Sequence, residues 1–281
     1  MTEISLLPRE RPVLATDLAA SDPPVPSLPL SRRARSWTLW LMLGALLIWS
    51  WAPAEMYRVT SLWTDWRNMA EFGRAFLRPD FHEWRSYIAD MVVTIQIAVW
   101  GTALAAVAGA PFAILASSNI APQWIVQPVR RLMDACRAIN EIVFALLFVV
   151  AVGLGPFAGV MALFVHNTGL FSKLYSEVVE AIDPRPVEGI RATGARRIPE
   201  IIFGVIPQVI PLWSSLILYR LETNVRSATT LGIVGAGGIG QTLYESMRAF
   251  QYAETAAQML IVVATVVVID MVSARLRRAL V

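Results

Sequence analysis

The chain has 281 residues, of which 56% are hydrophobic and only 16% charged, with a formal net charge of +3. Soluble domains carry roughly 25% charged residues, and the mean hydropathy here is +0.55. This composition predicts an all-α integral membrane protein and excludes the clustered positive charge of a nucleic-acid surface. One cysteine, Cys136, and two histidines exclude an internal disulfide, a cysteine metal cluster and a histidine-rich metal site.

Residues 1–36 contain six prolines and few apolar runs, and they end in an arginine cluster, Arg32, Arg33 and Arg35. This pattern is typical of disorder, so we predict a disordered cytoplasmic arm. No charge occurs from Trp37 to Ala54, about the minimum length for a first transmembrane helix over residues 37–54. The alternative is a cleaved signal peptide, because Ala52-Pro53-Ala54 resembles a cleavage site.

Residues 55–87 differ from the uncharged stretch before them, because charges of both signs alternate with aromatic side chains. The pattern favours an extracytoplasmic amphipathic segment at the lipid–water boundary, and a small structured loop is the alternative. Uncharged stretches then divide residues 88–281 into five further spans and their connections. The five spans are expected at residues 91–116, 138–152, 157–174, 203–225 and 255–272, with a connecting loop at 117–129.

Six spans place both termini on the same side of the membrane. Arginine clusters occur at residues 32–35, 130–137, 191–197 and 275–278, and all four fall on one side in this arrangement. Arginines near membrane segments mark the cytoplasmic side. The sequence therefore predicts about six transmembrane helices with cytoplasmic termini.

A charged island at residues 183–207 interrupts the apolar stretches on the cytoplasmic side. Asp183 suits an N-cap, Pro184 suits the first helical position, and Gly194 suits a left-handed residue after the helix end. We predict a short helix over residues 184–193 and a second helix start near Pro199. A helix this short is unstable alone in water, so a soluble partner is expected to hold it.

The order of residues in the island resembles a known motif. Glu188-Gly189-Ile190, three further residues, Gly194 and a later Ile206-Pro207 resemble the cytoplasmic EAA loop of ABC importer permeases. The segments NEIVFALLFVVAVGLGPFAG from Asn140, KLYSEVVEAIDPRPVEGIRATGA from Lys173 and ATTLGIVGAGGIGQTL from Ala228 resemble the phosphonate-type branch of that family. Gly189, Ile190 and Gly204 depart from the general pattern. The resemblance covers roughly residue 85 to the end.

The resemblance implies a type I ABC importer permease in the bacterial inner membrane, with residues 88–281 as the permease core and 177–207 as its coupling loop. It implies three kinds of partner: a second permease subunit, in a homodimer or with a related chain, two cytoplasmic ATPase subunits and an extracytoplasmic binding protein. Val187 and Ile190 would make apolar contacts with the ATPase, Gly194 would set the turn, and Pro207 would anchor the loop. The coupling-loop candidates are Val187, Glu188, Gly189, Ile190, Arg191, Gly194, Arg196, Arg197 and Pro207.

The chain lacks the Gly-x-x-x-x-Gly-Lys-Ser/Thr phosphate loop, so it is not expected to be an enzyme. The resemblance implies no cofactor in this chain, because ATP and Mg²⁺ would be bound by the partner ATPase. A secondary transporter is the alternative within membrane transport. That class commonly shows internal repeats, and residues 37–150 and 151–281 show no convincing repeat.

A glycine-rich segment follows span five. Residues 235–240 match G-x-G-x-x-G and come after Leu231-Gly232-Ile233-Val234, which has the composition of a strand. An NAD-binding membrane enzyme is the remote alternative, although too little chain follows for a dinucleotide fold. We expect instead an irregular, closely packed segment on the outer side that forms part of an outer gate. The gate candidates are Gly235, Gly237, Gly238 and Gly240.

Polar residues within the spans mark candidates for the translocation pathway, because they are costly in lipid. Arg226 and Glu222 are four residues apart and are expected to pair near the outer end of span five, which leaves Arg220 free for an anionic substrate. The resemblance implies a phosphonate or a related oxyanion, phosphite or phosphate. The alternative is that these residues only hold the bundle together. The candidates are Asn140, Glu141, His166, Arg220, Glu222, Asn224 and Arg226.

Overall fold

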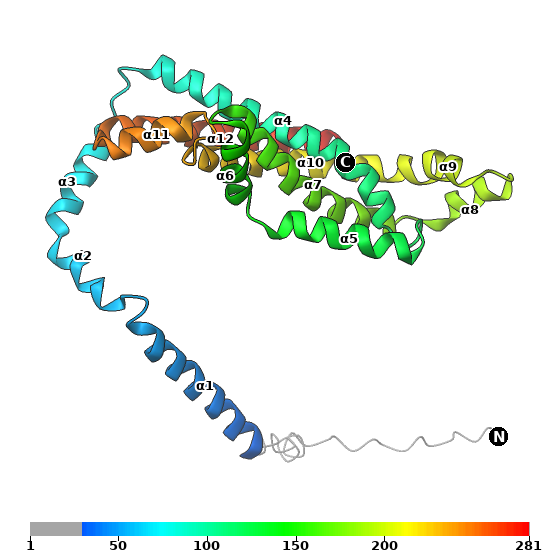
Figure 1. Cartoon of the computed structure of the whole chain (residues 1–281), viewed down its shortest axis with the longest axis horizontal. Coiled ribbons are helices and arrows are strands. Elements are labelled where there is room, and N and C mark those ends of the chain that lie inside the picture. Colours follow the sequence, from blue (N-terminus) through cyan, green and yellow to red (C-terminus); the bar gives the residue numbers. More distant parts are fainter. Residues whose placement is uncertain (1–29, 281) are drawn as a thin grey trace, which may run out of the picture. The chain divides into compact units, whose positions relative to one another are not determined.

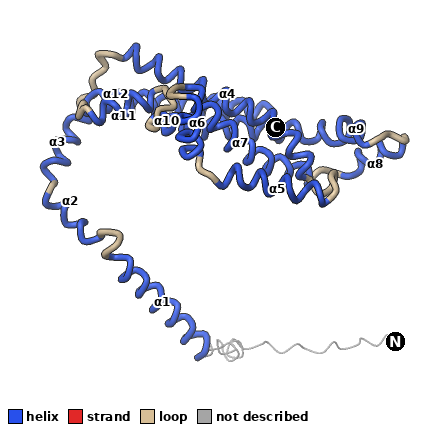
Figure 2. Tube along the Cα trace, in the orientation of Figure 1, coloured by secondary structure: helices blue, strands red, loops and turns tan. Residues whose placement is uncertain are grey.

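The structure is a computed structural model that describes residues 30–280, so most of the expected N-terminal arm lies outside the described residues. Every element from residue 30 to residue 280 is helical (Figure 2). The chain divides into two compact units, with the boundary between Arg67 and Asn68.

The N-terminal unit contains α1 (Leu30–Trp51), η1 (Met56–Thr60) and α2 (Ser61–Thr64). The helix α1 begins before the predicted span, so residues 30–36 are helical and do not belong to an arm. Bulky side chains around α1 are exposed, with Trp40 67% and Ile48 78% accessible. A helix that is apolar on all sides suits a lipid environment.

The segment predicted to lie at the membrane boundary is broken into short helices. Residues 37–51 and 56–64 are separated by a 73° bend, and α3 (Trp66–Phe76) follows α2 after one residue. None of η1, α2 and α3 alone is long enough to cross a bilayer. Their position at the lipid–water boundary stays a prediction.

The second unit is a bundle built around α7 (Pro156–Glu180), whose residues Leu163, Phe171 and Tyr175 are fully or almost fully buried. Neighbours on several sides cover α7. In Figure 1, α8 and α9 lie at one end of this bundle and α11 at the other. The neighbours of α7 are α4 (Trp84–Ala116), α5 (Gln123–Ala138), α6 (Glu141–Val152) and α10 (Ile206–Gly232). The remaining elements are α8 (Pro184–Ala192), α9 (Arg197–Pro199), η2 (Glu200–Val205), α11 (Ile239–Arg248) and α12 (Tyr252–Leu280).

Small residues let α4 approach α7 closely. A Cβ atom added at Gly101 would lie 2.6 Å from Cβ of Leu163, and one added at Gly109 would lie 2.7 Å from Cβ of Phe171. Such contacts matter in a membrane, where van der Waals packing drives the association of helices. The two glycines therefore set the spacing of the central helix pair.

Within residues 30–280, three helices are long and apolar enough to span a membrane, or up to five if each bent pair counts as one span. The sequence led us to expect six. The helix α7 is absent from this set although its length suffices, because His166, Asn167 and Lys173 lower its hydropathy. Neighbouring helices shield α7 from lipid, so it does not need an apolar surface. The three single spans are Trp84–Ala116, Arg197–Gly232 and Tyr252–Arg278.

The region between α4 and α7 corrects two predictions. Most of the expected loop at 117–129 is helix, since α5 begins at Gln123, directly after Pro122. The expected span at 138–152 is interrupted at Ile139 and Asn140 by an 86° bend between α5 and α6. The 12 residues of α6 rise only about 18 Å, too little to cross a bilayer unaided.

Candidate functional site

The charged island folds as its capping signals predict. The helix α8 starts at Pro184, and the carboxylate of Asp183 accepts a hydrogen bond of 3.0 Å from the backbone N–H of Arg185. Gly194 has a φ of +81° just after the helix end. The short helix and both of its caps are confirmed.

The chain then returns toward the bundle through α9 and η2 into α10. The six residues of η2 form a π-helical turn, and Pro207 lies in the first turn of α10. A π-helical turn inside a helix often marks a functional position. The side-chain oxygen of Gln208 accepts from the backbone N–H of Asp183 at 3.2 Å, so the two arms of the island are joined at their base.

The apolar side of α8 faces the chain's own η2. A Cβ atom at Gly204 would lie 3.1 Å from Cγ2 of Val187 and 3.4 Å from Cδ1 of Ile190. Val187 also packs against the buried cluster that contains Val205 and Val209. Both side chains are only partly buried by this contact, so the contact of Val187 and Ile190 with the ATPase stays a prediction.

A bidentate ion pair fastens the same two arms. Nε and Nη2 of Arg191 donate to Oε1 and Oε2 of Glu200, each at 3.0 Å. This hydrogen bonding raises the pKa of Arg191. A guanidinium and a carboxylate paired through two hydrogen bonds interact strongly and fix each other's orientation. Arg191 therefore joins the two arms of the loop. Sequence reasoning missed Glu200, although it is the only acidic residue between Glu188 and Glu222.

The outward face of the island consists mainly of polar residues and glycine, with one apolar side chain among them. Glu188, Gly189, Arg196 and Arg197 are exposed, and the apolar Ile198 beside them is 69% exposed. Among the predicted coupling residues, Glu188, Gly189, Arg196, Arg197 and the turn at Gly194 are therefore accessible to another molecule.

The Gly194 turn can be tested by substitution. We expect Gly194→Ala to destabilise the loop by about 1–2 kcal/mol, because a left-handed conformation strains a residue that has a Cβ atom. Gly194→Asn should cost less, since asparagine tolerates this region. No atom lies within 4 Å of the added Cβ, so crowding does not contribute. Limited proteolysis of the loop in the two variants measures the difference. Equal protection of both variants would contradict the expectation.

A polar cluster forms where α6, α7 and α10 meet. Nε2 of His166 lies 3.4 Å from Oε2 of Glu141, and Nδ1 lies 2.8 Å from the backbone oxygen of Ile139. Ser227 on α10 donates to the other carboxylate oxygen of Glu141 at 2.8 Å. The structure thus brings together two of the predicted pathway residues, His166 and Glu141.

Arg220 lies near this cluster and meets no carboxylate at ion-pair distance among residues 30–280. Its Nη2 donates to Oδ1 of Asn167 at 2.7 Å, while its Nε is buried without a hydrogen-bond partner. One turn further along α10, Nδ2 of Asn224 donates to Thr102 on α4 at 2.7 Å, and Oδ1 of Asn224 is also buried and unpaired. Arg220 and Asn224 thus present an unused donor and an unused acceptor on one face of α10.

Three other pathway candidates, Asn140, Glu222 and Arg226, have partners outside this cluster. Asn140 caps α6, since its side chain accepts from the backbone N–H of Ile142 at 2.9 Å. The predicted pair of Glu222 and Arg226 is present at 3.5 Å. Arg277 also lies 3.8 Å from Glu222. Because α10 and α12 lie side by side, this contact indicates that Glu222 lies at the same depth in the bundle as the C-terminal arginines. If those arginines are cytoplasmic, Glu222 does not lie near the outer end of its span, where the sequence predicts it.

Sequence reasoning did not select Ser227 and Thr102 as site residues, and it noted Asn167 only as a polar interruption of the span beside His166. A signal for Ser227 was available, because Arg220, Asn224 and Ser227 follow at spacings of four and three residues along one helical face. The partner on α4, Thr102, carried no comparable signal, since only the packing brings it to α10.

The glycine-rich segment forms a tight turn between α10 and α11. Gly235, Gly237 and Gly238 have φ of +90°, +76° and +74°. The backbone oxygen of Gly235 accepts from Gly155 at 2.9 Å, and the N–H of Ile239 donates to Thr94 at 2.9 Å. The turn therefore joins the start of α7 to α4. Residues 231–234 end a helix and enter this turn, so the strand required by the dinucleotide-binding alternative is absent there and that alternative is wrong.

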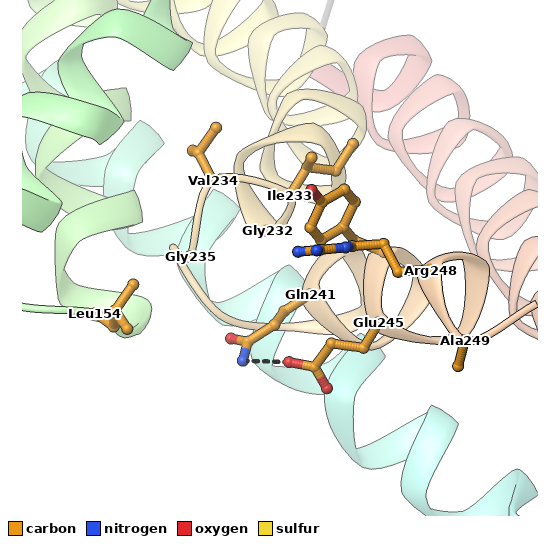
Figure 3. A pocket seen from close by; sticks show the side chains of 10 residues that line it. Leu154, Gly232, Ile233, Val234, Gly235, Gln241, Glu245, Arg248 and Ala249 are labelled. Atoms are coloured by element: carbon orange, nitrogen blue, oxygen red, sulfur yellow. Dashed lines mark hydrogen bonds between the residues drawn. The ribbon is translucent and has the colours of Figure 1, made fainter.

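A cavity of about 650 Å³ opens beside this turn. Figure 3 shows Gly235 and Leu154 on one side of it and the polar side chains of α11 on the other. The side-chain nitrogen of Gln241 donates to Glu245 at 2.9 Å, and Cζ of Arg248 lies 5.5 Å from the ring centre of Tyr244. An irregular backbone thus lines a cavity, as expected for this segment.

Comparisons with known proteins agree on one family. The model for binding-protein-dependent transport system inner membrane components matches residues 109–281. The phosphite transport system permease protein PtxC of Stutzerimonas stutzeri is 36% identical over 239 residues, which cover 85% of this chain and 86% of that protein. PhnE1 of Escherichia coli (strain K12), provisionally named a cryptic phosphonate transport system permease protein, is 54% identical over 144 residues, 50% of this chain and 69% of that protein.

A solved structure shares the fold. A chain of the methionine ABC transporter MetNI, in an inward-facing conformation, is similar with a TM-score of 0.59 at 21% identity, over 69% of this chain and 95% of that chain. The helical bundle, the EAA-type loop and the family match all indicate an ABC importer permease. The secondary-transporter alternative is therefore wrong. The chain therefore belongs to the family of binding-protein-dependent transport system inner membrane components, the permease subunits of ABC importers.

Proposed function

We propose that this permease imports a phosphorus oxyanion, phosphonate or phosphite or phosphate, across the bacterial inner membrane. The names of its relatives PtxC and PhnE1 support this class of substrate. The observation that carries the proposal is Arg220, a half-buried guanidinium in a spanning helix with an unpaired Nε. A buried cation without a carboxylate partner is costly unless an anion visits it.

The proposed complex contains a second permease subunit, two ATPase subunits that hydrolyse ATP with Mg²⁺, and an extracytoplasmic binding protein. Both termini face the cytoplasm. With the C-terminal arginines on that side, the contact between Arg277 and Glu222 supports a position of Glu222 in the inner half of the membrane.

The coupling loop is proposed to act as a braced lever. The internal contacts of Val187, Ile190 and Arg191 make α8, η2 and the start of α10 one rigid piece. The ATPase would therefore dock mainly on the outward residues Glu188, Gly189, Arg196 and Arg197, and a displacement of α8 would pass directly into α10. Pro207 lies on this route.

The glycine turn is proposed as part of the outer gate. It joins α4, α7 and α10 through backbone contacts and borders the cavity of about 650 Å³. Its glycines, Gly235, Gly237, Gly238 and Gly240, allow close packing when the gate is shut. A shift of α10 would reach the gate through Gly232, the last residue of that helix.

The role of Arg220 can be tested by uptake. We expect Arg220→Gln to lower uptake by roughly tenfold or more, because a hydrogen bond to a charged group contributes about 1.5–3 kcal/mol. The measurement is uptake of labelled phosphite, phosphate and methylphosphonate by cells that lack their own importers and express the whole complex. The matched control is Arg85→Gln, since Arg85 is an exposed arginine on the spanning helix α4 and is not a pathway candidate. Full uptake of all three compounds by Arg220→Gln would contradict the proposed role, and absence of uptake by the unaltered complex would contradict the substrate class.

A further inference from the structure

The turn between α4 and α5 is fastened to the last turn of α7. The backbone N–H and the hydroxyl of Ser118 both donate to Oε1 of Glu180, each at 2.7 Å. The side-chain nitrogen of Asn119 donates to the backbone oxygen of Val179 at 2.8 Å. Two successive residues of the turn therefore hold the end of α7, where the last backbone oxygens of a helix have no partner within it.

Arg130 on α5 joins the same contact. Its Nη2 donates to Oε1 of Glu180 at 2.5 Å, and its Nε donates to the backbone oxygen of Ala116, the last residue of α4, at 2.8 Å. The side chains of Arg130 and Glu180 are 30% and 31% exposed, so water screens the pair only in part. Hydrogen bonds between ionised groups are stronger than neutral ones. We call Ser118, Arg130 and Glu180 the Glu180 clasp, because they connect α4, α5 and α7.

The same turn lies against the coupling loop. Ile120 and Val187 both pack on the buried cluster that contains Val205. The turn and the loop also share a cavity of about 60 Å³, since Asn119 and Ile120 line one part of it and Val187 and Glu200 another. The turn between α4 and α5 thus borders both arms of the island.

The clasp is close to α8 along the chain. Only Ala181 and Ile182 separate Glu180 from Asp183, the N-cap of α8, and residues 181–183 are not helical. Short non-helical connections absorb displacements between helices, so a displacement of α8 would be lost there if the end of α7 were free. With the clasp formed, the same displacement acts on α4, α5 and α7 together.

We propose that Glu180 is a positioning residue for the coupling of ATP hydrolysis to transport. Through Ser118 and Arg130 it makes α4, α5 and α7 follow a displacement of α8, in addition to the route through η2 into α10. The inference rests on the proposed role of the coupling loop.

A distance measurement tests the clasp without any transported substrate. Spin labels are attached at Gln127 on α5 and Arg185 on α8, both exposed, after Cys136, the single cysteine, is replaced with alanine. Electron paramagnetic resonance then measures the distance between the labels in the whole complex with and without ATP. We expect ATP to leave this distance unchanged, and to shift it in Glu180→Gln, because the clasp then loses its charged acceptor.

Asp134→Asn is the matched control, since Asp134 pairs with Arg137 on its own helix. It should behave as the unaltered chain does. A shift with ATP in the unaltered chain would overturn the proposal, and so would a distance that ATP leaves unchanged in Glu180→Gln. Ser118→Ala removes one of the three hydrogen bonds at an exposed position, and it takes the place of Glu180→Gln if that variant does not fold.

A second readout is the amount of substrate taken up per ATP hydrolysed by the reconstituted complex. We expect Glu180→Gln to lower this ratio by about tenfold, in line with the loss of a hydrogen bond between charged groups, while ATP hydrolysis and the yield of folded complex stay near normal. A merely structural role would lower the yield, or both activities in proportion, and that result would contradict positioning. Absence of uptake of any phosphorus oxyanion by the unaltered complex would count against the substrate class, whereas the distance measurement would still decide the role of Glu180.

Discussion

Replacing Gly240 with alanine is expected to abolish accumulation of folded protein in the membrane. A Cβ atom at this position would overlap the backbone oxygen of Thr229 and would lie 3.0 Å from Cα of Gly232. Overpacking a core costs roughly 1–3 kcal/mol when side chains can yield, and more when they cannot. Here the obstacle is the backbone of α10, so α11 has to move away from it.

The measurement is the amount of protein extracted in folded form from membranes, together with its thermal unfolding. We expect less than about a tenth of the normal amount. Gly44→Ala is the matched control, because nothing lies within 4 Å of a Cβ atom there and alanine favours a helix. Normal accumulation and unfolding of Gly240→Ala would show that α10 and α11 are not packed as described.

The second large effect is expected from Gly204→Leu, which should separate ATP hydrolysis from transport. The leucine side chain would occupy the space of Val187 and Ile190 and push α8 away from η2. A loop that is no longer braced cannot pass a displacement to α10. We expect uptake to fall by roughly tenfold or more, in line with the cost of overpacking, while the complex still accumulates and hydrolyses ATP.

Uptake and ATP hydrolysis are measured on the same reconstituted complex. Gly73→Leu on α3 is the control, since its added Cβ meets nothing within 4 Å. A proportional loss of both activities would indicate failed docking instead of lost coupling. Unchanged uptake would contradict the proposed lever.

The sequence predicted what depends on neighbouring residues. Asp183, Pro184 and Gly194 mark the ends of α8 because capping is decided within one turn of the helix. The pair of Glu222 and Arg226 was predictable for the same reason, as its spacing alone brings the two groups together. The long apolar helices α4, α10 and α12 follow from composition.

Other features depend on what the helices meet. Val187 and Ile190 form an apolar stripe that looks the same whether it faces a partner or the chain's own η2, so the sequence could not distinguish the two. No charge occurs between Met91 and Val129, and this long run concealed the start of α5, although the predicted end of the span at residue 116 agrees with the end of α4. The 86° bend lies where His166 contacts the backbone of Ile139, and the sequence cannot show that these two residues, which are far apart in the chain, meet.

The polarity of α7 has a consequence for how the protein is made. A segment that leaves the ribosome enters lipid on its own only if it is sufficiently apolar, and α7 falls short of the spanning helices in this respect. The partner that satisfies Asn167 is Arg220, which is synthesised 53 residues later. We therefore expect α7 to take its final position in the membrane only after α10 has been synthesised.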